Sequence, residues 1–165
     1  MLDEFKQPVL IERYVEGREV YVTLLGNDQV APLPFHEIDF SRMPAGRPKI
    51  VSYAAKWDEN SPEYAGTTPV PVAELPAGWR ASIQRTAIAA FRALELRDYG
   101  RVDFRVAEDG TPYVIDVNPN CDISPGAGVA RAALASGMGY PQLIGRICEI
   151  AWERYRNANT KACAA

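Results

Sequence analysis

Two short runs of alternating residues, joined by Asp109-Gly110, constrain the fold of this chain more than any other feature. Residues 102–106 and 113–117 alternate apolar with polar side chains, and an Asp-Gly pair between such runs is the strongest short-range signal for a β-hairpin. A two-residue turn at this pair fixes the register of the two strands. The opposed pairs that it predicts are Glu108 with Thr111, Phe104 with Ile115, Asp103 with Asp116, Val102 with Val117, and Arg101 with Asn118.

This register divides the hairpin into a polar and an apolar face, because side chains alternate along a strand. The polar face holds Arg101, Asp103, Asp116 and Asn118, and the apolar face holds Val102, Phe104, Ile115 and Val117. Directly opposed residues have Cβ atoms about 4.5–5.5 Å apart, so the two carboxylates repel one another. A divalent cation removes that repulsion, and two carboxylates with an amide oxygen suit Mg²⁺. The alternative is that both aspartates are solvated on an exposed face, partly paired with Arg101 and Arg105. A one-residue slip in register would separate them.

The rest of the chain predicts an α+β fold, with a mostly antiparallel sheet and packed helices. Strands are expected at residues 9–15, 19–25, 29–35 and 49–57. Pro32 and Pro34 suit only an edge strand or an irregular one. Residues 41–48 and 58–76 are rich in Pro or polar residues and are expected to be loops.

Three helices are expected in the second half. Apolar residues at helical spacing predict one that faces the core, through Ile83, Ala87, Ala90, Phe91 and Leu94. Another covers residues 127–136 and ends at Gly137, and the last begins near Pro141. The apolar stripe of the last helix is Leu143, Ile144, Ile147, Cys148, Ala151 and Tyr155. The polar tail from Asn157 onward is expected to fray.

Composition argues against several classes of protein. Hydrophobic residues make up 47% of the chain and charged residues 24%, which is typical of a globular protein. The formal charge is −3 and no basic stripe occurs, so we expect no nucleic acid as partner. No apolar run is long enough to span a membrane, and no signal pattern is visible. Three cysteines, an odd number, favour a reducing cytoplasm.

Three separated blocks resemble the C-terminal lobe of ATP-grasp enzymes, most nearly the D-alanine–D-alanine ligase group. Residues 9–20 are similar to the hinge strand of that family and the strand after it, and residues 53–57 are similar to its Tyr-x-x-Lys stretch. The hairpin, followed by Ser124-Pro125-Gly126, completes the pattern. The resemblance implies an ATP-dependent carboxylate–amine ligase, which forms an amide through an acyl phosphate.

The resemblance also implies a role for individual residues. Glu12 and the backbones of Arg13 and Val15 would bind adenine, and Glu19 would hold the ribose hydroxyls. Lys56 and Arg101 would act on the reacting phosphate and the acyl intermediate. Asp103, Asp116 and Asn118 would bind Mg²⁺ or Mn²⁺. Without the resemblance, Glu12, Glu19 and Lys56 read as ordinary surface residues.

The sequence departs from the family pattern in three places. Asp116 stands where the family usually has glutamate, and residues 121–123 lengthen the loop that follows. The hinge-like block lies within the first residues, so the N-terminal half of the ATP clamp is missing. We therefore expect residues 1–156 to form one C-terminal lobe, with residues 157–165 as a tail, inactive alone. The missing half or a homodimer partner would complete it, and small-molecule carboxylates and amines would be substrates.

Two other functions stay open. One is a non-catalytic module that binds Mg-nucleotide or a partner chain, which an exposed apolar strip along residues 9–15 would support. The other is a plain metal-binding α+β domain, which would bind Mg²⁺ without a preference for nucleotide.

Overall fold

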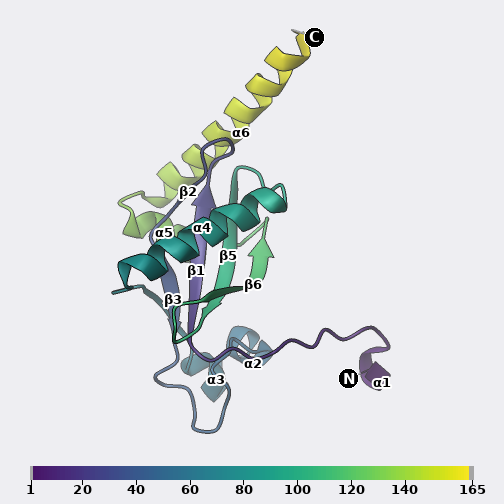
Figure 1. Ribbon diagram of the computed structural model, residues 1–165, viewed down its shortest axis with the longest axis vertical. Helices are drawn as coiled ribbons and strands as arrows, with labels where there is room; N and C mark the ends of the chain where they lie inside the picture. The colour runs from purple at the N-terminus through teal and green to yellow at the C-terminus, as the bar shows by residue number, and fades with distance from the viewer. Residues whose placement is uncertain (1, 164–165) are drawn as a thin grey trace.

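A six-stranded antiparallel sheet forms the centre of the computed structural model, which describes residues 2–163, with side chains from 4 to 160 (Figure 1). Its strands are β1 (Arg18–Leu25), β2 (Ala31–Pro32), β3 (His36–Asp39), β4 (Thr68–Pro71), β5 (Tyr99–Val106) and β6 (Pro112–Asn118). The order is β4-β3-β1-β5-β6, and β2 pairs with β1. All pairs are antiparallel, which confirms the predicted α+β class.

One face of the sheet is apolar and packs against helix α4 (Ala77–Ala93), which crosses it in Figure 1. The helix contributes Ile83, Ala87 and Phe91, as its spacing predicted. The sheet contributes three alternate residues from each central strand, namely Val20, Val22 and Leu24 of β1 and Val102, Phe104 and Val106 of β5. Leu94 was also expected in this core, but it lies just beyond the end of the helix and is 61% exposed.

A second apolar cluster joins the end of β1 to helices α5 (Gly128–Ala135) and α6 (Tyr140–Cys163). Only the first half of α6 packs there, and the second half projects from the body in Figure 1. Tyr155, predicted in its apolar stripe, is exposed for this reason, and Cys148 is exposed because it lies on the outer side of the packed half. The helix continues through Cys163 and so includes much of the tail that was expected to fray. None of the described helices is long and apolar enough to cross a membrane.

Two predicted strands are wrong. Residues 9–15 form no strand, because they run extended without a backbone partner among the described residues. The strand expected at residues 49–57 is absent, because residues 49–52 belong to no strand and residues 53–57 are helix α2 (Tyr53–Trp57). The Ser52 side chain caps this helix by accepting a hydrogen bond from the Ala55 amide. The expected loop at 58–76 contains α3 (Pro62–Ala65) and β4. Of the strand expected at 29–35, only Ala31–Pro32 forms a strand (β2), and β3 begins after this range at His36. Helix α1 (Leu2–Phe5) was not predicted.

The β5–β6 hairpin confirms the register predicted for its polar residues, although its turn differs from the prediction. Arg101 lies opposite Asn118, and Asp103 opposite Asp116. The Ala107 amide donates to the Thr111 carbonyl, so the loop has three residues instead of two. A bulge at Ile115 compensates for that extra residue, and Phe104 faces Val114 as a result. Ile115 is consequently 43% exposed and does not lie in the core, where it was predicted.

Gly110 closes the hairpin loop at φ +86°, and alanine there should destabilise the fold. A Cβ at this position would overlap the Trp79 indole. Gly137 has the same φ but no atom within 4 Å of a Cβ, so Gly137→Ala is the matched control. We expect Gly137→Ala to lower the free energy of unfolding by about 1–2 kcal/mol. Overlap should add about 1–3 kcal/mol in Gly110→Ala. Urea unfolding measures both, and equal losses would contradict the packing described here.

Candidate active site

The face of the sheet opposite α4 carries a row of buried polar side chains. They come from directly paired positions of the two central strands, where Glu19 lies opposite Arg105, Tyr21 opposite Asp103, and Thr23 opposite Arg101. Glu19, Thr23, Asp103 and Arg105 are each at most 6% exposed. Buried polar groups are normally hydrogen-bonded, and these bond mainly to one another and to nearby backbone carbonyls. The prediction that Arg101 and Asp103 share a face is confirmed.

The Asp103 carboxylate lies near the positive charge of Arg101 and the negative charge of Asp116. Arg101 donates to it from Nε and Nη2, each at 2.7 Å, and the Arg101 guanidinium stacks 4.7 Å from the centre of the Tyr21 ring. Burial raises the pKa of Asp103, Arg101 lowers it, and the carboxylate of Asp116 raises it again. Asp116 itself is exposed. The predicted pair of neighbouring carboxylates is therefore present, with one member buried and one facing solvent.

The oxygen atoms of Asp103, Asp116 and Asn118 suit a magnesium ion that is also bound to phosphate. Arg101 occupies two of the roughly four lone-pair positions of the Asp103 carboxylate, which leaves others for a metal. Asn118 Oδ1 accepts from the Asn120 amide at 3.0 Å and keeps a second lone pair. No cluster of three or more His, Cys, Asp or Glu suited to a metal occurs within the described chain. Two carboxylates and an amide match Mg²⁺ that completes its coordination with water and phosphate oxygens.

Two cations lie beside the carboxylate pair. Lys56, on α2, is close enough to lower the pKa of Asp103, and its Nζ lies 5.2 Å from the Trp57 ring centre. Arg101 Nη1, the terminal nitrogen not bonded to Asp103, points toward the start of α5. A Cβ on Gly128 would lie 3.6 Å from it and 4.0 Å from Arg131 Nη2. The structure thus brings Arg131, which the sequence analysis did not single out, close to Arg101.

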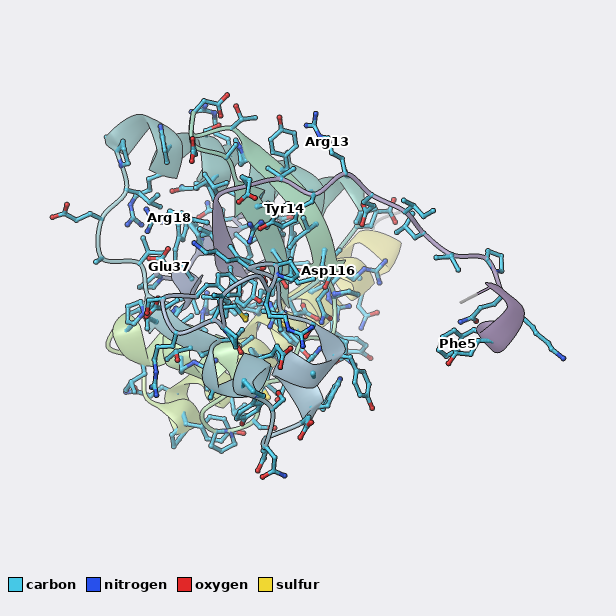
Figure 2. The ribbon with its side chains drawn as sticks, turned by 90° about the horizontal axis from the view of Figure 1, so that it is seen from below. Phe5, Arg13, Tyr14, Arg18, Glu37 and Asp116 are labelled. Atoms are coloured by element: carbon cyan, nitrogen blue, oxygen red, sulfur yellow. The ribbon has the colours of Figure 1, made fainter. Side chains whose placement is uncertain are left out.

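A cavity of about 560 Å³ adjoins this polar face. It is lined by residues 12–15, Glu19, Ile50, Val51, Arg105 and residues 113–115. All four residues expected to bind nucleotide, namely Glu12, Arg13, Val15 and Glu19, lie in this lining. The bulge that exposes Ile115 gives the cavity part of its apolar wall. Figure 2 shows the extended segment that carries Arg13 and Tyr14 along one side of the molecule.

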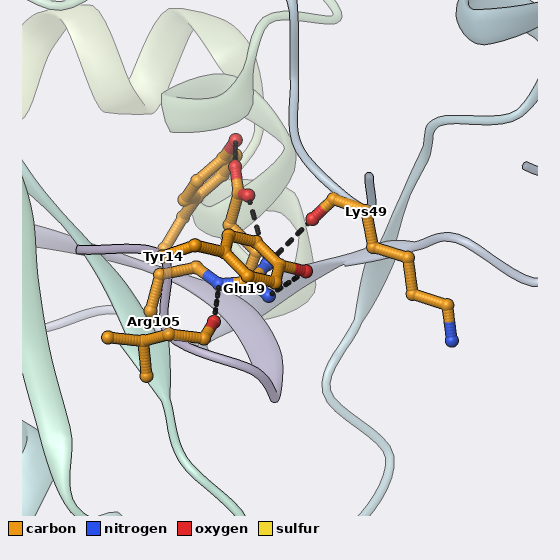
Figure 3. Close-up of polar contacts among 6 residues, drawn as sticks. Tyr14, Glu19, Lys49 and Arg105 are labelled. Atoms are coloured by element: carbon orange, nitrogen blue, oxygen red, sulfur yellow. Dashed lines mark hydrogen bonds and ion pairs between the residues drawn. The ribbon is translucent and has the colours of Figure 1, made fainter. Parts of the chain in front are cut away.

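Arg105 is a site residue that the sequence analysis considered only as a partner of the aspartates. The residue is 4% exposed, and its guanidinium contacts Tyr14, Val15, Glu19 and Lys49 (Figure 3). The signal that could have found it is strand alternation, since Arg105 follows Asp103 by two residues on the same face. Its partners are distant in sequence, so alternation alone could not identify them.

Titration of Glu19 should make the free energy of unfolding fall as pH rises. Burial raises its pKa, although bonds from the Tyr21 hydroxyl at 2.7 Å and from Arg105 lower it. The folded state then retains this proton to a higher pH than the unfolded state, so stability falls from the ordinary pKa up to the raised one. Glu19→Gln should flatten this decline, as urea unfolding from about pH 2 to 8 would show.

Asp98 is the matched control for that experiment. Its hydrogen bonds from Arg154 lower its pKa, so its contribution to stability is lost as pH falls below about 4. Asp98→Asn should therefore change the acid end of the profile and leave the decline above pH 4 in place. An unchanged decline in Glu19→Gln would contradict the raised pKa of Glu19.

Comparison with known proteins identifies the family. The family described as D-ala D-ala ligase C-terminus matches residues 2–149. Uncharacterized protein y4sG of Sinorhizobium fredii is 31% identical over 157 residues, which cover 94% of this chain and 44% of that protein. The D-alanine–D-alanine ligase of Desulfotalea psychrophila is 31% identical over 146 residues, covering 88% of this chain and 42% of the ligase.

Solved structures show the same fold. The D-alanine–D-alanine ligase from Bacillus anthracis complexed with ATP matches with a TM-score of 0.67 at 23% identity, over 89% of this chain and 42% of the ligase chain. The ligase from Coxiella burnetii matches with a TM-score of 0.71 at 21% identity, over 93% and 37%. This chain spans less than half the length of these relatives. It belongs to the D-alanine–D-alanine ligase C-terminal family, and its fold is that of the C-terminal lobe of ATP-grasp enzymes.

Proposed function

We propose that this chain is the nucleotide- and metal-binding lobe of an ATP-dependent carboxylate–amine ligase. One observation supports this most strongly. Asp103 and Asp116 lie opposite one another, Arg101 and Asn118 are the next polar pair, and the cavity adjoins the same strands. A phosphate-bound Mg²⁺ would offset the repulsion between the two carboxylates, which solvation of the sheet face alone does not explain.

The residues proposed to contact the nucleotide all line the cavity. Glu12 and the backbones of Arg13 and Val15 would bind the adenine edge, and Glu19 would accept hydrogen bonds from the ribose. Glu19 already accepts from Tyr21 and Arg105, so it has fewer lone pairs for a ligand. Asp103, Asp116 and Asn118 would hold Mg²⁺, which when bound offsets negative charge on phosphate oxygens.

The proposed reaction has two steps. A carboxylate oxygen of the first substrate attacks the γ-phosphorus of ATP, the bond to ADP breaks, and an acyl phosphate forms. The amine then attacks the acyl carbon, inorganic phosphate leaves, and an amide remains after loss of a proton. Lys56 and Arg101 would offset the charge that develops on these oxygens, and their position beside Asp103 supports that role. Residues 1–156 would act as this lobe together with a second ATP-binding half. The free thiols of Cys121 and Cys148 are compatible with a cytoplasmic location.

A specific observation also favours a non-catalytic binding module. Leu10 is 81% exposed and Ile11 is 89% exposed, and they belong to a segment without strand pairing. Neighbouring exposed apolar side chains are typical of surfaces that a partner covers. On this alternative the chain would bind Mg-nucleotide or another chain and perform no reaction.

Calorimetric titration of the purified chain tests the proposal, with Mg-ATP, ATP in EDTA, and Mg²⁺ alone as the three titrants. We expect binding of Mg-ATP, much weaker binding of ATP without metal, and little binding of Mg²⁺ alone. Equal binding of Mg²⁺ with and without nucleotide would indicate a plain metal-binding domain. ATP turnover, assayed with the same preparation, is expected to be very low, and turnover by the chain alone would exclude the non-catalytic alternative.

A further inference from the structure

The segment that forms one wall of the cavity is attached to the body in an unusual way. Residues 12–16, here called the hinge segment, belong to no strand. Residues 7–16 form no backbone-to-backbone hydrogen bond with the rest of the described chain. A wall that binds a ligand must nevertheless keep its position, so side chains of the body have to hold it.

One side chain, that of Arg105, provides most of the polar contacts between the hinge segment and the rest of the described chain. Arg105 Nε donates to the Val15 carbonyl at 3.0 Å, and Nη2 donates to the Tyr14 hydroxyl at 3.2 Å. The same guanidinium lies 5.3 Å from the centre of the Tyr14 ring. Apart from Arg105, the hinge segment has a cation–π contact in which Arg13 lies 5.8 Å from the Tyr113 ring centre.

The other contacts of Arg105 reach two further parts of the cavity lining. Its Nη1 donates to the Lys49 carbonyl at 3.0 Å, immediately before Ile50 and Val51, and lies 3.4 Å from Glu19 Oε2 (Figure 3). A guanidinium presents five N–H donors in a rigid fork, which suits several acceptors at fixed angles. Lysine has a single flexible ammonium and cannot match this set.

We propose that Arg105 is a positioning residue that docks the hinge segment onto the sheet and thereby shapes the nucleotide cavity. It takes the place of the strand pairing that the hinge segment lacks. The inference rests on the proposed function for its ligand, but its structural part can be measured without any nucleotide. Because the backbones of Arg13 and Val15 would read the adenine edge, Arg105 also controls selection of the base.

The test compares Arg105→Met and Arg105→Lys with the unaltered chain. Backbone amide order parameters of residues 12–16 should be near 0.85 in the unaltered chain and fall below about 0.6 in Arg105→Met. The affinity for Mg-ATP should fall roughly 10- to 100-fold, since several hydrogen bonds from a charged group are lost. The preference for ATP over GTP should fall as well, because contacts to phosphate do not depend on the hinge segment. For Arg105→Lys, the order parameters, the affinity and the base preference should each lie between those of the unaltered chain and those of Arg105→Met.

Arg18→Met is the control. It removes a guanidinium that forms two 2.7 Å hydrogen bonds with Glu37 on the same sheet, outside the cavity lining. It should leave both the order parameters and the base preference unchanged, whereas a general loss of stability would affect Arg18→Met and Arg105→Met alike. If Arg105→Met does not fold, Arg105→Lys and Tyr14→Phe carry the same comparison with smaller expected changes.

The outcomes separate this inference from the proposed function. A hinge segment that is already mobile in the unaltered chain, or equally ordered in Arg105→Met, overturns the inference. An unaltered chain that binds no nucleotide removes the proposed function, while its order parameters still decide the role of Arg105. Loss of affinity with an unchanged preference for ATP over GTP overturns the part that concerns the base.

Discussion

Alanine at Asp116 is expected to abolish Mg²⁺-dependent nucleotide binding while leaving the fold intact. Asp116 is exposed, and its carboxylate forms no hydrogen bond with another described residue, so the free energy of unfolding should change by no more than about 0.5 kcal/mol. The affinity for Mg-ATP should fall at least about 100-fold, since even the loss of a group that only orients a metal ligand costs 10- to 100-fold.

Calorimetry with Mg-ATP and urea unfolding of the same preparation check both halves of this prediction. Glu108→Ala is the matched control, because it removes one negative charge from an exposed residue of the same hairpin. It should leave the affinity within about twofold of the unaltered chain, since surface charges beyond a Debye length of about 10 Å are screened. An Asp116→Ala variant with unaltered affinity would remove the metal-site assignment.

Replacement of Arg101 by methionine should cause a large loss of stability. It leaves the Asp103 carboxylate, which is 6% exposed, without its two 2.7 Å hydrogen bonds and next to the like charge of Asp116. Breaking a buried ion pair by removing one partner typically costs about 3–5 kcal/mol. For a chain of this size that corresponds to a fall in Tm of about 6–20 °C.

The double variant Arg101→Met/Asp103→Asn separates the buried charge from lost packing. Removing the charge should recover most of the stability, so the two substitutions should be strongly non-additive in a double-mutant cycle. Thermal and urea unfolding of both single variants and the double variant provide the measurement. A loss below about 1 kcal/mol in Arg101→Met, or simple additivity, would mean that this pair is not buried as described.

The paired carboxylates could be predicted from sequence, although for a partly incorrect reason. Strand alternation and the Asp-Gly turn placed Asp103 opposite Asp116, as the structure confirms. The two-residue turn assumed for that register is wrong, and the bulge at Ile115 cancels the error. The register near the site was therefore correct while the prediction for Ile115 was not. Alternation reports which residues share a face, but bulges depend on packing that one strand does not encode.

The parts that sequence could not predict depend on contacts between distant segments. Residues 9–15 are apolar and β-branched, as strands are, but a strand needs a partner along its backbone. Residues 53–57 read as a strand until the Ser52 cap is taken into account. Arg105 looked like one of several charged residues on a strand, and its role becomes visible only when Tyr14, Val15 and Lys49 surround it.

A crystal structure of this chain with Mn²⁺ and a non-hydrolysable ATP analogue is the most direct test of the central claim. Mn²⁺ takes the same oxygen ligands as Mg²⁺ and can be located by its anomalous scattering. The account predicts an anomalous peak bonded to oxygens of both Asp103 and Asp116, with the base of the analogue against residues 12–15. Nucleotide and metal bound elsewhere, with both aspartates free of metal, would contradict it.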